Sequence, residues 1–197
     1  MRHFNLLLSV MAISFLFGCS NEPLNEDQAN LERRRNDVKL AAQSETTFTS
    51  NDDVHCFETT LVAGQHHEAG LVTVDIEGDY LIITYSSNGD WEIGTTHLSI
   101  GNCDENWAPL TGSGNPKVGH FEYTEPYSYG PYEVVYMVSL EGLDDHYCFA
   151  AHAEVVGPSG GETAWADGSQ FDGNGWAMYV ESYLSDCQEN NGGNGPY

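Results

Sequence analysis

Three histidines are the residues of this chain best placed to do metal chemistry. His97 lies in "THL", His120 in "GHF" and His152 in "AAHAE", and each is within or next to a predicted strand. Imidazole nitrogens bind zinc and copper, and three of them from separate strands would form a metal centre if the fold brought them to one point. The alternative is structural, since a histidine on a strand often serves as a hydrogen-bonded residue in or near the core.

An acidic loop offers ligands of a harder kind. The segment "DGSQFDGNG" carries Asp167, Asp172 and Asn174, whose carboxylate and amide oxygens are the donors that calcium prefers. Calcium is therefore the cofactor that this loop suggests. The segment lacks the regular ligand spacing of an EF-hand, so a solvated surface loop is the competing interpretation.

Aromatic side chains indicate a binding surface near the same loop. Trp165 and Trp176 flank it, and "YTEPYSYGPYEVVY" holds five tyrosines between residues 123 and 136. Exposed rings stack on sugars and anchor protein interfaces, so the expected partner is a glycan or a cell-surface protein. The same rings would be core or cross-strand pairs if the strands bury them.

No motif for a catalytic nucleophile accompanies these residues. The sequence contains neither a GxSxG elbow nor an HExxH helix, and the neighbouring acids Asp144 and Asp145 fall in a turn. We therefore expect a binding or structural module rather than a catalyst. The alternative is a metal-dependent extracytoplasmic enzyme centred on His97, His120 and His152.

Four cysteines beyond Cys19 predict two disulfides. Their spacing lacks the paired CxxC pattern of a zinc site, and an even number suits an exported chain. Three connectivities are open. We favour Cys56 with Cys187, which would join the first and last strands, and Cys103 with Cys148, which would fix the long loop 101–118 to a central strand.

The elements that must position these residues are strands. Apolar and polar residues alternate from Val54 onward, and "EGD" and "NGD" are hairpin signals that make residues 70–101 a three-stranded meander. We predict an all-β domain, an antiparallel β-sandwich of jelly-roll type with about eight strands and two disulfides. The further strands are expected near residues 55–62, 119–124, 132–140, 146–156 and 176–184.

Charge limits the partners of this domain. The chain has 6 lysines and arginines against 30 aspartates and glutamates, a formal net charge of −24. A surface of this sign repels phosphate backbones and anionic lipid headgroups. Nucleic acid is therefore excluded as a partner, and any contact with a membrane needs an anchor.

The N-terminus supplies a candidate anchor. An apolar stretch, Phe4 to Phe17, follows Arg2 and is shorter than the roughly 20 residues of a membrane span. Its end, Leu16-Phe17-Gly18-Cys19, resembles the signal of bacterial lipoproteins. The resemblance implies cleavage before Cys19 and acylation of that cysteine. Acyl chains would then hold the protein on a membrane.

The chain divides accordingly into four segments. We expect a signal peptide over residues 1–18, a lipidated polar tether over 19–52 that is partly helical, the β-domain over 53–187 and a disordered tail over 188–197. The expected location is the bacterial cell envelope, lipid-anchored at the outer membrane and open to surface display.

Five stretches of the domain carry a second resemblance: "AGQHHEAGLVTV", "THLSIG", "GNPKVGHFEY", "YCFAAHAEV" and "ETAWADGSQFDGNGWAMYVESY". With them the domain resembles an uncharacterised β-rich module of exported bacterial cell-surface proteins. The resemblance implies an extracellular β-domain and carries no activity over to any residue.

Overall fold

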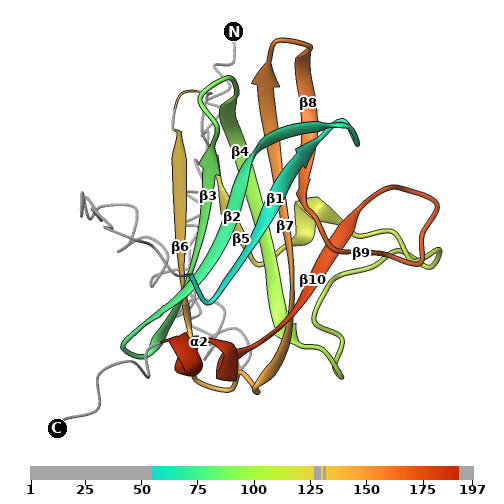
Figure 1. Cartoon of the computed structure of the whole chain (residues 1–197). Helices are drawn as coiled ribbons and strands as arrows, with labels where there is room; N and C mark the ends of the chain where they lie inside the picture. Colours follow the sequence, from blue (N-terminus) through green and yellow to red (C-terminus); the bar gives the residue numbers. More distant parts are fainter. Residues whose placement is uncertain (1–54, 127–129, 131, 191–197) are drawn as a thin grey trace, which may run out of the picture.

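The computed structural model describes residues 55–126, 130 and 132–190, and shows an all-β domain (Figure 1). A 3₁₀ turn, η1 (Val118–His120), and a C-terminal helix, α2 (Leu184–Asn190), accompany the strands. The strands are β1 (Phe57–Ala63), β2 (His67–Glu77), β3 (Tyr80–Ser87), β4 (Glu92–Asn102), β5 (Tyr123–Glu125), β6 (Glu133–Ser139), β7 (His146–Gly157), β8 (Gly160–Ala166), β9 (Ser169–Gln170) and β10 (Met178–Tyr183).

All ten strands belong to one antiparallel sheet. Eight of them follow the order β5-β4-β7-β8-β1-β2-β3-β6, and the sheet curls into a half-barrel (Figure 1). The other two are β10, which pairs with β7, and β9, which pairs with β10. β10 and β8 lie along the same edge of β7. β10 pairs with the first part of β7, and β8 pairs with its second half. The long strand β7 is thus hydrogen-bonded along both edges, because β4 pairs with most of its other side.

The concave face of the sheet encloses the main core. Alternate residues of β7 point into it, from Tyr147 to Val155, and meet aliphatic and aromatic side chains of the other strands. Tyr123 on β5 and Tyr136 on β6 bring their ring centroids to 6.2 Å. The two edge strands of the sheet therefore face each other across the core. The Tyr136 hydroxyl also lies 2.7 Å from the hydroxyl of Thr96 on β4.

The expectation of an antiparallel all-β domain with two disulfides is confirmed, and two details differ. The sandwich would need two separate sheets, whereas here the pairing of β8 with β1 makes the sheet continuous. The meander over residues 70–101 is wrong beyond β2 and β3, because β3 pairs with β6 and β4 pairs with β7. A turn signal marks where the chain reverses, but it does not choose the hydrogen-bonding partner.

The sequence pattern did not predict β8, β9, η1 or α2. β8 begins with two glycines and falls in a segment where no strand was predicted, yet it forms a hairpin with β7. α2 is too short to show a helical period. Asp145 fixes its start: a carboxylate oxygen accepts a hydrogen bond from the Ser185 N–H at 2.8 Å, and the backbone carbonyl accepts one from Leu184.

Two disulfides close the domain, and they are the favoured pairs. Cys56 is bonded to Cys187 across 131 residues, which ties the start of the domain to α2. Cys103 is bonded to Cys148 across 45 residues, which fixes the loop after β4 to β7.

Several expectations lie outside the described residues. They are the signal peptide 1–18, the acylation site Cys19, the tether up to residue 52 and the end of the tail from residue 191. No helix within the described part is long and apolar enough to cross a membrane.

The two disulfides are expected to differ in their contribution to stability. A cross-link restricts the unfolded chain more when it closes a longer loop. Replacing Cys56 and Cys187 together by alanine should cost about 5 kcal/mol, and replacing Cys103 and Cys148 about 4 kcal/mol. Urea unfolding of the two double variants measures the difference. A larger loss for the shorter loop would contradict this order.

Candidate functional site

A second apolar cluster lies on the convex face of the sheet. Outward-facing residues of β7, β8 and β10 are covered there by two loops, residues 103–122 and 171–177. Phe121, Trp165 and Phe171 are buried in this cluster, and Trp107 and Tyr179 pack against it. Both faces of the middle of the sheet are therefore apolar. On the convex face, the two loops form a hollow between themselves and the strands.

Close packing and one disulfide hold the first loop to the sheet. Gly101 lets Trp107 approach β4, because a Cβ at position 101 would lie 2.9 Å from the Cβ of Trp107. The Ser99 hydroxyl donates to the Trp107 carbonyl at 2.9 Å. Together with the bond of Cys103 to Cys148, these contacts place the indole of Trp107 over the strands.

Asn115 joins the second loop to the first. Its amide oxygen accepts a hydrogen bond from the Gly175 N–H at 3.0 Å, and its amide nitrogen donates to Ser113 at 3.1 Å. A Cβ on Gly173 would lie 2.2 Å from that same oxygen, so only glycine fits there. A side-chain amide thus organises the "DGNG" turn.

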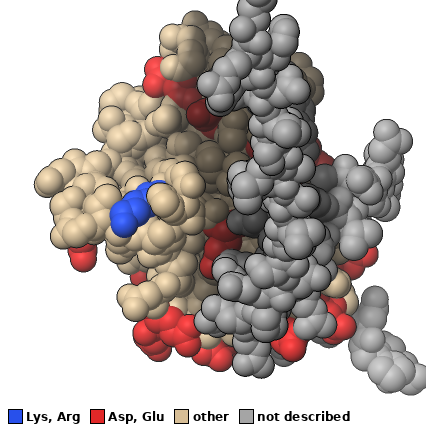
Figure 2. Space-filling model, turned by 180° about the vertical axis from the view of Figure 1, so that it is seen from behind, with Lys and Arg blue, Asp and Glu red and all other residues tan. Residues whose placement is uncertain are grey.

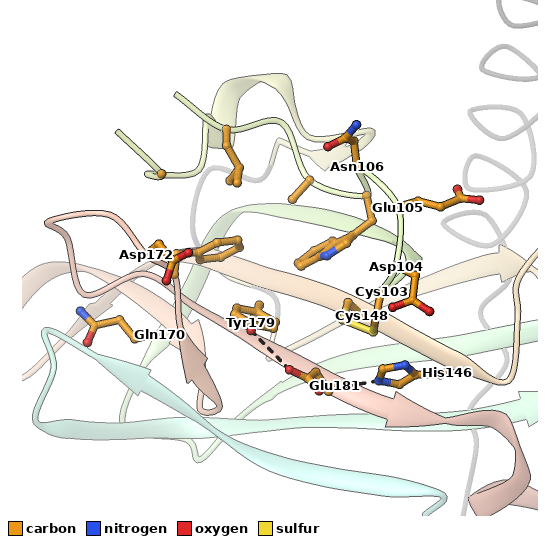
Figure 3. A pocket seen from close by; sticks show the side chains of 15 residues that line it. Cys103, Asp104, Glu105, Asn106, His146, Cys148, Gln170, Asp172, Tyr179 and Glu181 are labelled. Carbon is orange, nitrogen blue, oxygen red and sulfur yellow. Dashed lines mark hydrogen bonds and ion pairs between the residues drawn. A yellow bond between two sulfur atoms is a disulfide. The ribbon is translucent and has the colours of Figure 1, made fainter. Parts of the chain in front are cut away.

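Between these loops and the strands lies a hollow of about 450 Å³, which we call the acidic hollow (Figure 3). Three rings form its apolar part: Trp107, Phe171 and Tyr179. Their centroids are 5.9 Å apart for Trp107 and Phe171, 5.6 Å for Trp107 and Tyr179, and 5.0 Å for Phe171 and Tyr179. The rest of the lining is Cys103, Asp104, Glu105, Asn106, Ala108, Leu110, Gly114, His146, Cys148, Gln170, Asp172 and Glu181.

Carboxylates surround the three rings. In the view of Figure 3, Asp172 stands toward one end of the hollow, and Asp104 and Glu105 stand toward the other. The Tyr179 hydroxyl donates to Glu181 at 3.3 Å, and the His146 Nε2 lies 3.6 Å from the second oxygen of Glu181. Partial burial, followed by the negative charge of Glu181, raises the pKa of Tyr179.

The two tryptophans expected at a binding surface differ in their exposure to solvent. Trp165 is 5% exposed and packs against Phe121 and His152, so it presents no face to a ligand. Trp176 is half-buried and lines a second hollow of about 550 Å³, together with Asp167 and Met178 among others.

The tyrosine-rich segment is likewise divided. Tyr123 and Tyr136 are buried in the main core, whereas Tyr132 is 58% exposed. Tyr127 and Tyr129 lie outside the described residues.

The proposed three-histidine centre is not assembled. His97 and His152 lie directly opposite each other on β4 and β7, with ring centroids 5.5 Å apart. His120 is exposed on η1. Among the residues that the structure describes, no group of three or more His, Cys, Asp or Glu side chains is arranged to hold a metal ion.

The candidate calcium ligands are also distributed. Asp167 lines the second hollow, Asp172 lines the acidic hollow, and Asn174 is exposed on the loop between β9 and β10. The structure thus places the two carboxylates in different hollows rather than in one.

Apart from Asp172 and the disulfide pair Cys103 and Cys148, the residues of the acidic hollow were missed at the sequence level. Trp107, Tyr179 and Glu181 come from two segments, and their convergence depends on β10 pairing with β7. One local signal existed, a tryptophan within a long loop that begins at a cysteine.

Comparison with family models, with curated proteins and with solved structures finds no match for this chain. What the candidate site binds is therefore inferred from its geometry and chemistry alone.

His152 is the most strongly perturbed histidine of the convex face. It is 7% exposed, and its Nδ1 has no hydrogen-bond partner within the described part of the chain. Burial, with the adjacent His97 as a second cause, lowers the pKa of His152 to about 3. Burial also lowers the pKa of His97. Both imidazoles are therefore neutral at pH 7, which suits packing against Trp165.

Acid should therefore weaken the fold through His152. The unfolded chain takes up a proton below the ordinary histidine pKa of 6.5, and the folded chain does so only near 3. Stability from this residue is complete above pH 6.5 and declines as the pH falls toward 3. Between about pH 8 and about pH 5 the loss should be about 2 kcal/mol.

The variants His152→Phe and His152→Gln test this expectation by urea unfolding at several pH values. Each should remove the same pH-dependent part from the wild-type curve, whatever it does to stability at pH 8. A wild-type minus variant difference that stays constant with pH would contradict the burial argument.

Proposed function

We propose that this chain is a lipid-anchored protein of the bacterial cell envelope whose β-domain binds a ligand in the acidic hollow. One observation carries the proposal: three aromatic rings and four carboxylates converge there from two loops and the strand β10. Ligand sites in proteins combine an apolar surface with a few polar groups that orient the ligand. The acidic hollow has this composition.

The hollow rests on a rigid support, as a binding site requires. Its strands β7 and β10 belong to the sheet, and its first loop is fixed by the disulfide of Cys103 and Cys148. A ligand would therefore meet rings already in place, which reduces the entropy cost of binding. The expected ligand classes are a glycan, by stacking on the rings, and a segment of a protein.

The envelope location is supported by two features. The two disulfides fit an oxidising compartment outside the cytoplasm. The resemblance of Leu16-Phe17-Gly18-Cys19 to a lipoprotein signal supplies the anchor, which a domain of this negative charge needs in order to stay on a membrane.

Acylation of Cys19 is tested by metabolic labelling. The wild-type chain expressed in a bacterium should incorporate labelled palmitate and sediment with membranes. The Cys19→Ser variant should incorporate none and leave the membrane fraction, because no acyl chain remains to be buried. A wild-type chain that sediments without label would contradict the lipid anchor.

Ligand binding in the acidic hollow is tested by calorimetry on the purified chain. The probes are cellohexaose, N-acetylchitohexaose, an arginine-containing pentapeptide and a glutamate-containing pentapeptide. At least one should bind saturably, and Tyr179→Ala should weaken that binding by about tenfold because a stacking ring is lost.

The matched control for this experiment is Tyr132→Ala, which removes an exposed tyrosine that does not line the hollow. Its binding should equal that of the wild type. Thermal unfolding of each variant verifies that the fold is intact. No binding by any of the four probes, or equal binding by both variants, would contradict the proposed site.

A further inference from the structure

The acidic hollow is unbalanced in charge. Asp104, Glu105, Asp172 and Glu181 line it, and the described lining contains no lysine or arginine. Lys117 is the only lysine or arginine in residues 55–190 and is not among the lining residues. The one basic group is the imidazole of His146, which is 3.6 Å from Glu181. The hollow therefore holds more negative charge than the described residues can neutralise.

A metal ion does not account for this charge. The described residues hold no group of three or more His, Cys, Asp or Glu side chains that could share one ion, and these four carboxylates are included in that statement. They are spread around the rings rather than gathered at one point (Figure 3). A distributed negative rim is complementary to a ligand that carries its positive charge on extended groups.

Resting on the function proposed above, we infer that the acidic hollow binds the cationic side chains of a basic protein segment, with arginine preferred over lysine. The planar guanidinium stacks on aromatic faces and pairs with carboxylates through two parallel hydrogen bonds. Trp107 and Tyr179, which are partly exposed, offer the first kind of contact, and the acids around them offer the second.

The formal net charge of the whole chain, −24, favours a protein segment over a single amine. Acidic side chains also lie at several places on the back of the molecule, where little basic surface is visible (Figure 2). A partner with several basic residues would be attracted at long range and oriented before contact. Carboxylates at both ends of the hollow likewise match two or more cations along one chain.

The experiment measures binding of two acetylated, amidated pentapeptides, Gly-Arg-Gly-Arg-Gly and the same sequence with citrulline in place of arginine. Citrulline keeps the shape of the side chain and removes its charge. The purified full chain should bind the arginine peptide at least about tenfold more tightly than the citrulline peptide. Raising sodium chloride from about 50 to about 500 mM should weaken only the arginine peptide.

Isosteric variants locate the effect. Asp172→Asn and Glu181→Gln should each weaken the arginine peptide, by about fivefold to tenfold, while Asp167→Asn, on the other hollow, serves as the matched control and should bind as the wild type does. Equal affinity for both peptides, or equal losses in all three variants, would overturn the inference.

The probes separate this inference from the proposed function. If cellohexaose binds and depends on Tyr179 while the arginine peptide does not bind, the hollow is a ligand site but the cationic partner is wrong. If none of the four probes binds, both proposals are wrong. Binding of the arginine peptide that survives Tyr179→Ala would show general attraction to acidic surface and would also overturn the inference.

Discussion

The structure depends on β7, the strand that is hydrogen-bonded along both edges and apolar on both faces. Its inward residues, such as Tyr147 and Phe149, are fully buried in the main core. Its outward residues, Cys148, Ala150 and His152, are nearly as buried beneath the two convex-face loops. Because one pleated strand alternates its side chains between the faces, β7 couples the core to the candidate site.

This coupling explains why a loop-built site can be rigid. The loop after β4 cannot leave the sheet without breaking the Cys103 to Cys148 bond or uncovering apolar surface on β7 and β8. The second loop cannot leave without losing its hydrogen bond to Asn115. Packing, the disulfide and this hydrogen bond therefore hold both loops against the sheet.

The two kinds of ionisable group on the convex face meet opposite conditions. His152 is enclosed by Trp165 and His97, so its charge is removed by burial. The acids of the hollow are at its open rim, and Asp104, Glu105, Asp172 and Glu181 are all exposed there. Water can stabilise these charges in the absence of a ligand, which is why the fold tolerates them without a lysine or arginine in the hollow.

The sequence by itself determined the features that depend on local pattern and composition. Alternation of apolar residues located most of the strands. The even count of cysteines predicted two disulfides, and the expected closeness of the first and last strands favoured, among three connectivities, the pairs Cys56–Cys187 and Cys103–Cys148 that the structure shows. Composition determined the negative charge. The sequence did not reveal that β4 pairs with β7 rather than with β3, because distant strands compete for the same hydrogen-bonding partners.

Only the tertiary structure decided which chemical groups meet. His97, His120 and His152 share a residue type and a strand context, yet two of them face each other and the third lies apart on η1. Trp165 is buried in the apolar cluster of the convex face. Trp107, which no sequence motif marked, lines the acidic hollow. A side chain's neighbours depend on strand pairing and on which face its position in the pleat assigns it, and a change of one residue in register reverses that face.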